Sequence, residues 1–290
     1  MTKEEFQRLT QKVTLLDGAT GSNLIAQGMP RGICVEAWIL EHKEIIQALQ
    51  RAYAEAGSKI IYAPTFGGNR INLKSYGLEN RLEEINRTLV SYTREAVGRK
   101  AYVAGDITTT GKILSGNEEY TYEMAFENYC EQIRILADAG VDCIIAETMI
   151  NIEETLAAVD AANTVCRLPI LCSMTVEADG SIFSGGNAAE AAAALESAGA
   201  SAVGINCSVG PDQLTSVVRN IRENISIPVI AKPNAGMPFI DGQGNAHYSM
   251  KPEEFARHMK VLVENGAMLI GGCCGTTPEY IRQTAQIMGL

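Results

Sequence analysis

Short apolar stretches alternate with longer amphipathic stretches along the whole chain. Each apolar stretch is rich in β-branched residues and is followed by a polar or glycine-rich turn. Stretches that are apolar throughout are typical of strands buried on both faces of a parallel sheet. Eight strands are predicted, at residues 13–17, 59–66, 101–106, 142–148, 169–176, 201–207, 228–234 and 267–274.

The amphipathic stretches between these strands carry their own start and stop residues. Pro211, Pro252 and Pro278 stand at first helical positions, where proline is favoured, and Gly57 and Gly140 follow predicted helix ends. Eight helices are predicted, at residues 39–56, 79–98, 121–139, 151–165, 187–198, 211–224, 252–264 and 278–288.

Eight strand–helix units over 290 residues leave about 36 residues per unit, which fits a (β/α)8 TIM barrel. Open doubly wound sheets show the same alternation, and the pattern does not reveal whether the sheet closes. The glycine-rich turn at residues 17–22 matches neither a dinucleotide-binding nor a P-loop motif, so nucleotide binding gains little support. We therefore predict an α/β fold, a TIM barrel that forms a single domain over residues 1–290.

Charge and hydropathy narrow the set of partners. The chain has 24 Lys and Arg against 34 Asp and Glu, a formal net charge of −10, and no basic block that would follow a phosphate backbone. No stretch approaches the ~18 apolar residues of a membrane span, and the polar N-terminus lacks the apolar core of a signal peptide. We expect a cytoplasmic protein with neither nucleic acid nor membrane as partner.

Three of the eight cysteines stand at predicted strand ends. The active sites of TIM barrels lie at the carboxyl ends of the strands. Cys207 ends the sixth predicted strand, and Cys273 and Cys274 end the eighth. Three thiolates with a fourth position left open are typical of a catalytic zinc site, so these three cysteines are the predicted zinc ligands and catalytic residues.

The alternative for a cysteine that stays reduced is a small buried hydrophobe. Successive residues of a strand point to opposite faces, so Cys273 and Cys274 can share one ion only at a distorted strand end. Gly271, Gly272 and Gly275 would permit that distortion. The buried-hydrophobe interpretation is preferred for Cys34, Cys130, Cys143, Cys166 and Cys172.

Charged residues also stand at the predicted strand ends. Asp17 and Glu147 would either accept hydrogen bonds from loop N–H groups or face the barrel mouth together, where a ligand ammonium group would relieve their repulsion. Lys232 is either a Schiff-base amine or an ion-pair partner for these acids. An amino-acid substrate fits the paired carboxylates.

With these residues laid out, the chain resembles the homocysteine S-methyltransferase family, and within it the homocysteine-binding module of cobalamin-dependent methionine synthase. Two departures from the family pattern stand at Ala63–Pro64 and at Thr108–Thr109. The matching stretches cover essentially the whole chain and are 16–21, 65–66, 69–70, 105–106, 110–112, 147–148, 204–207 and 271–278.

The resemblance implies zinc on the three cysteines, with the thiolate of homocysteine as fourth ligand and methionine as product. Asp17 and Glu147 would hold the substrate's amino group. Backbone N–H groups around Gly18 and Ala19, and around the Thr65–Phe66 turn, would help to place the substrate. The bound zinc would deprotonate a thiol whose free pKa is ~8.5.

The segment from Lys232 to Pro238 resembles the corresponding segment of methionine synthase and favours methylcobalamin, carried by a separate corrinoid protein, as the methyl donor. S-methylmethionine, betaine and methyltetrahydrofolate are the alternative donors. If one barrel fills the chain, a folate- or cobalamin-binding domain is expected elsewhere. Asn234, at the end of the seventh predicted strand, would either supply an oxygen ligand when substrate is absent or stabilise its loop.

Two interpretations outside methyl transfer also remain at this point. A metal-free barrel lyase would use Lys232 through a Schiff base, which borohydride would trap. A non-enzymatic zinc-thiolate subunit would bind the ion tightly with its fourth position closed to thiols.

Overall fold

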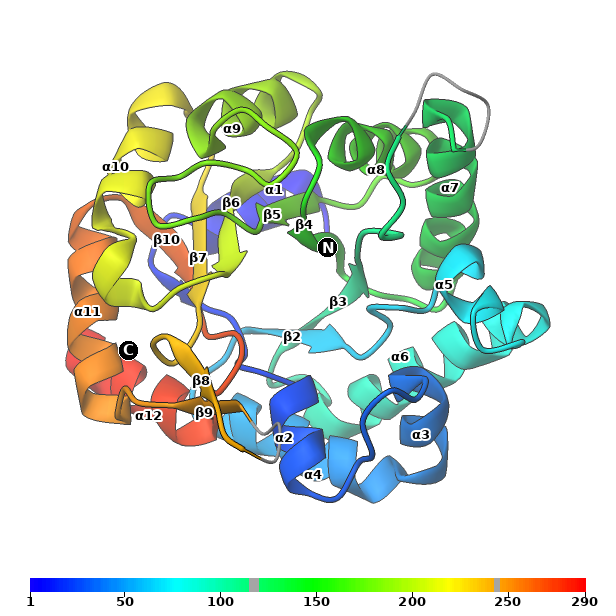
Figure 1. Ribbon diagram of the computed structural model, residues 1–290, viewed down its shortest axis with the longest axis horizontal. Coiled ribbons are helices and arrows are strands. Elements are labelled where there is room, and N and C mark those ends of the chain that lie inside the picture. Colours follow the sequence, from blue (N-terminus) through cyan, green and yellow to red (C-terminus); the bar gives the residue numbers. More distant parts are fainter. Residues whose placement is uncertain (115–119, 243–245) are drawn as a thin grey trace.

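The computed structural model describes residues 1–114, 120–242 and 246–290. Eight parallel strands form a ring, with helices arranged around its outside (Figure 1). An isolated parallel bridge between Leu16 and Ile60 joins the first strand to the second and closes the ring. The order of strands around the ring is β1 (Thr14–Leu15), β10 (Ala267–Ile270), β7 (Val229–Pro233), β6 (Ala202–Cys207), β5 (Ile170–Met174), β4 (Cys143–Met149), β3 (Tyr102–Ile107) and β2 (Ile60–Ala63).

The TIM barrel predicted from the sequence is therefore confirmed, and the open doubly wound sheet is excluded. Every predicted strand is present, although several end earlier than the apolar stretches suggested. The helices that surround the strands are α3 (Val35–Glu41), α4 (Lys43–Glu55), α6 (Leu82–Val97), α7 (Tyr122–Asp138), α8 (Ile152–Val165), α9 (Ala188–Ser197), α10 (Thr215–Asn224), α11 (Pro252–Glu264) and α12 (Pro278–Met288).

The first predicted helix, residues 39–56, was wrong as a single element. The chain forms two helices, α3 and α4, which meet at His42, whose backbone is not helical (φ −130°, ψ 45°). The His42 ring stacks on Trp38 at 3.8 Å between centroids, and its Nδ1 lies 2.8 Å from the Trp38 carbonyl oxygen. These contacts hold the corner between the two helices.

Several short elements have no counterpart among the predicted ones. Each is too short to show a clear hydrophobic period, or it is polar throughout. They are α1 (Lys3–Leu9), α2 (Gly21–Ala26), α5 (Arg70–Lys74) and an antiparallel hairpin of β8 (Pro238–Ile240) and β9 (Ala246–Tyr248). The predicted helices 79–98 and 211–224 instead begin with 3₁₀ turns, η1 (Glu79–Arg81) and η2 (Pro211–Gln213), which precede α6 and α10.

The inside of the barrel is filled by a connected cluster of apolar side chains, called the inner layer below, and α1 covers its amino-terminal end. Phe6 of α1 is 1% exposed and packs into this layer. A larger apolar cluster lies between the sheet and the outer helices. The amino-terminal end is therefore closed by apolar packing, and polar groups are left for the carboxyl end. The inner layer consists of Leu16, Ile60, Tyr62, Ala104, Cys143, Ile145, Leu171, Ala202, Ile230 and Leu269.

Four of the five cysteines expected to be hydrophobic filler are buried, and Cys166 is half-buried; all five are free thiols. Within the described part of the chain, no helix is both long and apolar enough to cross a bilayer.

Candidate active site

The thiols of Cys207, Cys273 and Cys274 meet at the carboxyl end of the barrel, where their sulfur atoms all lie within 4.8 Å of one another. Cys207 Sγ is 3.8 Å from Cys274 Sγ, and Cys273 Sγ is 4.0 Å from Cys274 Sγ. An ion with tetrahedral Zn–S bonds of ~2.3 Å would hold its sulfur ligands about 3.8 Å apart. The cluster thus has the donor type and the spacing of a zinc site.

The backbone at the end of β6 is unusual where it carries the first of these cysteines. Cys207 and Ser208 both have left-handed backbone conformations, with φ of 61° and 67°. Such a conformation costs a non-glycine residue of order 1–3 kcal/mol, and strain of this kind gathers at functional sites. The Ser208 hydroxyl accepts a hydrogen bond from the Val176 N–H at 2.8 Å, which holds the turn against the β5 side of the mouth.

The other two cysteines lie in a turn, not in a strand. β10 ends at Ile270, so the predicted strand 267–274 was four residues too long. The Cys273 N–H donates to the Pro233 carbonyl at 2.8 Å, and the Cys274 carbonyl accepts from the Ala235 N–H at 3.0 Å. These bonds fasten the turn to the end of β7, with both sulfur atoms on one side.

A glycine at the end of this turn is required for two reasons. Gly275 has φ of 82°, which disfavours any residue with a Cβ. A Cβ at this position would also lie 2.3 Å from the Tyr248 ring of β9. The glycine-flanked distortion that the sequence predicted is therefore present, in the form of a tight turn.

A pocket of about 390 Å³ opens over the cysteine cluster. Its wall carries residues from β1, β2, β3, β4 and β7 as well as the cysteines, so it occupies the mouth of the barrel. The lining residues that matter for chemistry are Asp17, Gly18, Ala19, Tyr62, Phe66, Asp106, Glu147, Thr148, Cys207, Lys232, Cys273 and Cys274.

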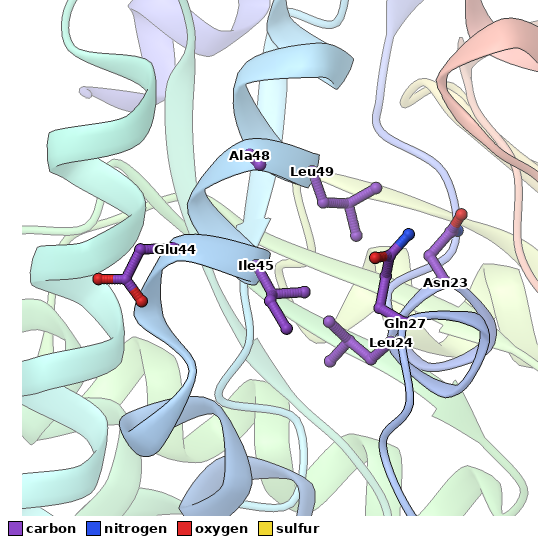
Figure 2. Close-up of a pocket in the computed structure, with 7 residues that line it drawn as sticks. All are labelled: Asn23, Leu24, Gln27, Glu44, Ile45, Ala48 and Leu49. Carbon is purple, nitrogen blue, oxygen red and sulfur yellow. The ribbon is translucent and has the colours of Figure 1, made fainter.

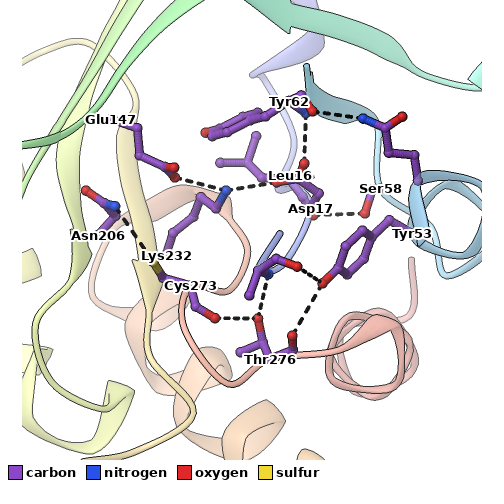
Figure 3. A network of polar contacts seen from close by, with 12 residues as sticks. Leu16, Asp17, Tyr53, Ser58, Tyr62, Glu147, Asn206, Lys232, Cys273 and Thr276 are labelled. Carbon is purple, nitrogen blue, oxygen red and sulfur yellow. Dashed lines mark hydrogen bonds and ion pairs between the residues drawn. The ribbon is translucent and has the colours of Figure 1, made fainter. Parts of the chain in front are cut away.

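Lys232 stands between the two carboxylates that the sequence paired (Figure 3). Its Nζ lies 2.8 Å from Asp17 Oδ1 and 3.1 Å from Glu147 Oε1. It also lies 3.6 Å from the centroid of the Tyr62 ring, a cation–π contact. All these groups are buried, and the ion pairs therefore lie in a region of low dielectric constant.

These contacts decide between the two interpretations of Lys232. Burial alone would lower the pKa of Lys232, but Asp17 and Glu147 outweigh it and raise that pKa well above its ordinary value. A Schiff-base lysine needs a lowered pKa so that its amine is free. The geometry thus favours the ion-pair interpretation. Burial raises the pKa of Glu147 to about 7.

A β-bulge near the end of β4 brings Glu147 to the pocket. The pairing of β4 with β5 shifts by one residue between Ala146 and Met149, and Thr148 has φ of 57°. Asn206 holds this bulge, because its Oδ1 accepts from the Thr148 N–H at 3.0 Å and its Nδ2 donates to Thr148 Oγ1 at 2.7 Å. Asn206 Nδ2 also lies 3.9 Å from Cys273 Sγ, so it links the acidic side to the cysteine cluster.

A sequence model of the homocysteine S-methyltransferase family matches residues 14–288. The chain belongs to this family. The methionine synthase of Mycobacterium tuberculosis (strain ATCC 25618 / H37Rv) is 31% identical over 96% of the chain and 25% of that protein. The methionine synthase of Mycobacterium leprae (strain TN) is 30% identical over 97% of the chain and 24% of that protein. The chain thus spans about a quarter of the length of these relatives.

Solved structures of Escherichia coli homocysteine methyltransferase MmuM share the fold. The oxidized form superimposes with a TM-score of 0.80 at 22% identity, over 95% of this chain and 96% of that one. The metallated form also gives a TM-score of 0.80 at 22% identity, over 98% and 99% of the two chains. The family resemblance drawn from the motifs is confirmed, and the structures of MmuM share the barrel fold.

The other residues predicted to contact substrate take different places in the barrel. Gly18, Ala19 and Phe66 line the pocket. Thr65 lies behind it, where its N–H donates to the Ala63 carbonyl at 2.7 Å and its hydroxyl donates to the Asp106 carbonyl at 2.8 Å. Thr65 therefore supports the wall, and of this turn only Phe66 is placed to face a ligand.

Asn234 directly follows β7 and is buried, and one atom of its side-chain amide has no hydrogen-bond partner. Its Nδ2 donates to the Ser208 carbonyl at 3.0 Å, as expected of an asparagine that stabilises a loop. Its Oδ1 is buried and has no hydrogen-bond partner. The loop-stabilising contact is therefore present, and the role of Asn234 as an oxygen ligand stays a prediction.

Some functional residues were not predicted from the sequence. Tyr53 and Thr276 form a network around the Ala19 backbone, and Tyr62 lines the pocket and donates its N–H to Asp17 Oδ2 (Figure 3). Thr276 Oγ1 accepts from the Ala19 N–H at 3.1 Å and donates to the Cys273 carbonyl at 2.7 Å, and the Tyr53 hydroxyl donates to the Ala19 carbonyl at 2.8 Å. The position of Thr276 just after the paired cysteines was the one available signal.

The two departures from the family pattern also have visible roles. Pro64 directly follows the end of β2 and lines the pocket. The Thr108 hydroxyl donates to the Glu147 carbonyl at 2.7 Å, and the Thr109 hydroxyl donates to the buried Glu154 at 2.6 Å. The threonines therefore tie the end of β3 to β4 and α8.

A second hollow, of about 330 Å³, lies outside the barrel between α2 and α4 (Figure 2). Among the described residues that line this hollow, Glu44 is the one ionisable residue and none is a cysteine. The chemistry of this family thus belongs to the barrel mouth. The lining residues of this hollow are Asn23, Leu24, Gln27, Glu44, Ile45, Ala48 and Leu49.

Proposed function

We propose that the protein transfers a methyl group to the thiol of homocysteine and so produces methionine. The observation that carries this proposal is the set of three cysteine sulfurs at zinc-site spacing, opening into the same pocket as a buried acidic wall. A thiol amino acid is the ligand that such a pocket would accommodate, with sulfur at one side and ammonium at the other. Membership of the homocysteine S-methyltransferase family supports the same substrate.

We propose one zinc ion on Cys207, Cys273 and Cys274. The spacing of the three sulfurs supports the ion, and the buried Asn234 Oδ1 has no hydrogen-bond partner in the protein. Zinc at this position would supply the charge that keeps a thiol deprotonated at neutral pH, where a free thiol of pKa ~8.5 is mostly protonated. The three cysteines would hold the ion in the wall of the pocket, where a substrate thiol could reach it. Asn234 would complete the ligand set in the absence of substrate.

The remaining residues of the pocket would bind and orient the substrate. Asp17 and Glu147 form the acidic wall toward the amino group, and Lys232 keeps their charges in balance. Gly18 and Ala19 line the β1 side of the pocket, and Phe66 lines the β2 side, where Thr65 supports it. These contacts fix the thiol relative to the opening, through which a methyl donor must approach.

For the donor, we propose methylcobalamin presented by a corrinoid protein. The resemblance of residues 232–238 to methionine synthase supports this choice, as do the two mycobacterial methionine synthases among the relatives. S-methylmethionine, betaine and methyltetrahydrofolate are the alternatives. The MmuM structures show that a similar barrel occurs in an enzyme named homocysteine methyltransferase.

One assay series tests the proposal. Purified protein is analysed for metal content and then incubated with L-homocysteine and each donor in turn, with and without a corrinoid protein. About one zinc per chain, and methionine formed with methylcobalamin only when the corrinoid protein is present, are the expected results. A zinc-containing preparation that forms no methionine with any donor would overturn the proposed activity, and methionine from another donor alone would overturn the proposed donor.

A further inference from the structure

The pocket contains four carboxylates but one lysine. Asp17, Glu36, Asp106 and Glu147 all line it, and among the described residues of its wall Lys232 is the one basic residue. Lys232 pairs with Asp17 and Glu147 and lies over Tyr62. No ion pair is found for Asp106 among the described residues, and its Oδ1 is buried without a hydrogen-bond partner. Lys232 is therefore committed to Asp17 and Glu147, and the Glu36 carboxylate accepts hydrogen bonds from the Gly67 N–H and the Cys34 thiol.

The strand geometry directs Asp106 into the barrel. A Cβ on the preceding residue, Gly105, would lie 3.1 Å from Leu136 of α7, so that position faces the outer helices. Because successive residues of a strand point to opposite faces, Asp106 faces inward, like Ala104 of the inner layer. Its backbone is fixed by Thr65, whose Oγ1 accepts from the Asp106 N–H at 3.1 Å and donates to the Asp106 carbonyl at 2.8 Å.

A buried carboxylate without a partner is energetically unfavourable. Asp106 is 5% exposed, and leaving such a group ionised and unpaired costs several kcal/mol. Burial, followed by the nearby charge of Glu147, raises the pKa of Asp106 well above its ordinary value. A cationic ligand group placed beside Asp106 would remove this cost, because it would pair with the acid that the protein leaves unpaired.

We propose that Asp106 accepts the ammonium group of the substrate directly and so makes the enzyme select α-amino thiols over simple thiols. In this arrangement Asp17 acts through Lys232, and Glu147 is shared between Lys232 and the substrate. The inference rests on the proposed function, because Asp106 would contact the amino group of the homocysteine substrate while the thiol lies at the cysteine cluster. Asp106 becomes a specificity-determining residue of the same pocket.

The test compares two thiols that differ only in the amino group. The zinc-loaded protein is titrated calorimetrically with L-homocysteine and with 4-mercaptobutyrate, which lacks that group. Asp106→Asn keeps the shape of the side chain and removes its charge. We expect a roughly 10- to 100-fold rise in the Kd for L-homocysteine and no loss of affinity for 4-mercaptobutyrate, since a hydrogen bond to a charged group is worth about 1.5–3 kcal/mol.

Asp138→Asn is the matched control, because it removes one negative charge from the exposed surface of α7. It should leave both dissociation constants unchanged. Asp106→Ser, a smaller polar replacement, repeats the test if the asparagine variant does not fold. Equal binding of L-homocysteine by wild type and either Asp106 variant would overturn the inference. Wild-type protein that binds neither thiol would instead overturn the proposed function.

Discussion

The two ends of the barrel are built from different kinds of residue. At the amino-terminal end, Phe6 of α1 packs against the inner apolar layer, and this end is closed. At the carboxyl end, buried charges, three thiols and left-handed backbone at Cys207 and Ser208 surround an open pocket. The first arrangement lowers the free energy of the fold, and the second raises it. The barrel thus separates the residues that stabilise it from those that perform chemistry.

Exchanging a cysteine at each end gives the largest contrast. Cys273→Ala removes one ligand of the proposed zinc site and should abolish both zinc binding and methyl transfer, with the barrel still folded. Cys143→Ala removes a thiol from the inner apolar layer and should keep full zinc content and activity. Elemental analysis, a methylation assay and circular dichroism measure the three properties. Unfolding of the Cys273 variant would show that the ion stabilises the fold, against the separation described above.

The closed end should show the opposite behaviour. Phe6→Ala would leave a cavity beneath the inner layer, and substitutions of this kind cost about 3–5 kcal/mol. We expect that loss in the free energy of unfolding, measured with denaturant, while the zinc content and the affinity for L-homocysteine stay at wild-type values. A variant that folds but loses zinc would show that the two ends are coupled.

What the sequence predicted well follows from periodicity and from position at strand ends. The strands of the barrel were all visible as apolar stretches, and the rule that barrel chemistry lies at the carboxyl ends of strands singled out Cys207, Cys273 and Cys274. These three thiols do come together. An apolar strand and the residue at its end are each properties of a single segment of the chain, so both can be predicted from the sequence alone.

The features that the sequence did not reveal depend on contacts between distant segments. Lys232 lies 215 residues from Asp17 in the chain, so its place between two acids is a property of the closed ring. The exact end of β10 was missed because the glycines and cysteines after Ile270 are compatible with both strand and turn. Thr65 was predicted to contact substrate, yet its hydroxyl bonds to the next strand, a pairing that no local pattern indicates.

The smallest expected effect is the pH dependence of stability that comes from the buried charges at the carboxyl end of the barrel. Burial raises the pKa of Glu147 to about 7, against ~4.3 for an unfolded glutamate, so the folded state binds the extra proton between these values. Stability contributed by protonated Glu147 is therefore greatest at low pH and is lost as the pH rises through 7. Glu147→Gln cannot ionise and should lack this component, which amounts to at most about 4 kcal/mol. We expect the stability of wild type relative to this variant, measured by denaturant unfolding of the metal-free proteins, to fall between pH 5 and pH 8. If the stability difference between wild type and the variant stays constant or rises over this pH range, Lys232 keeps Glu147 ionised at every pH tested. The buried carboxylates at the pocket would then not destabilise the fold.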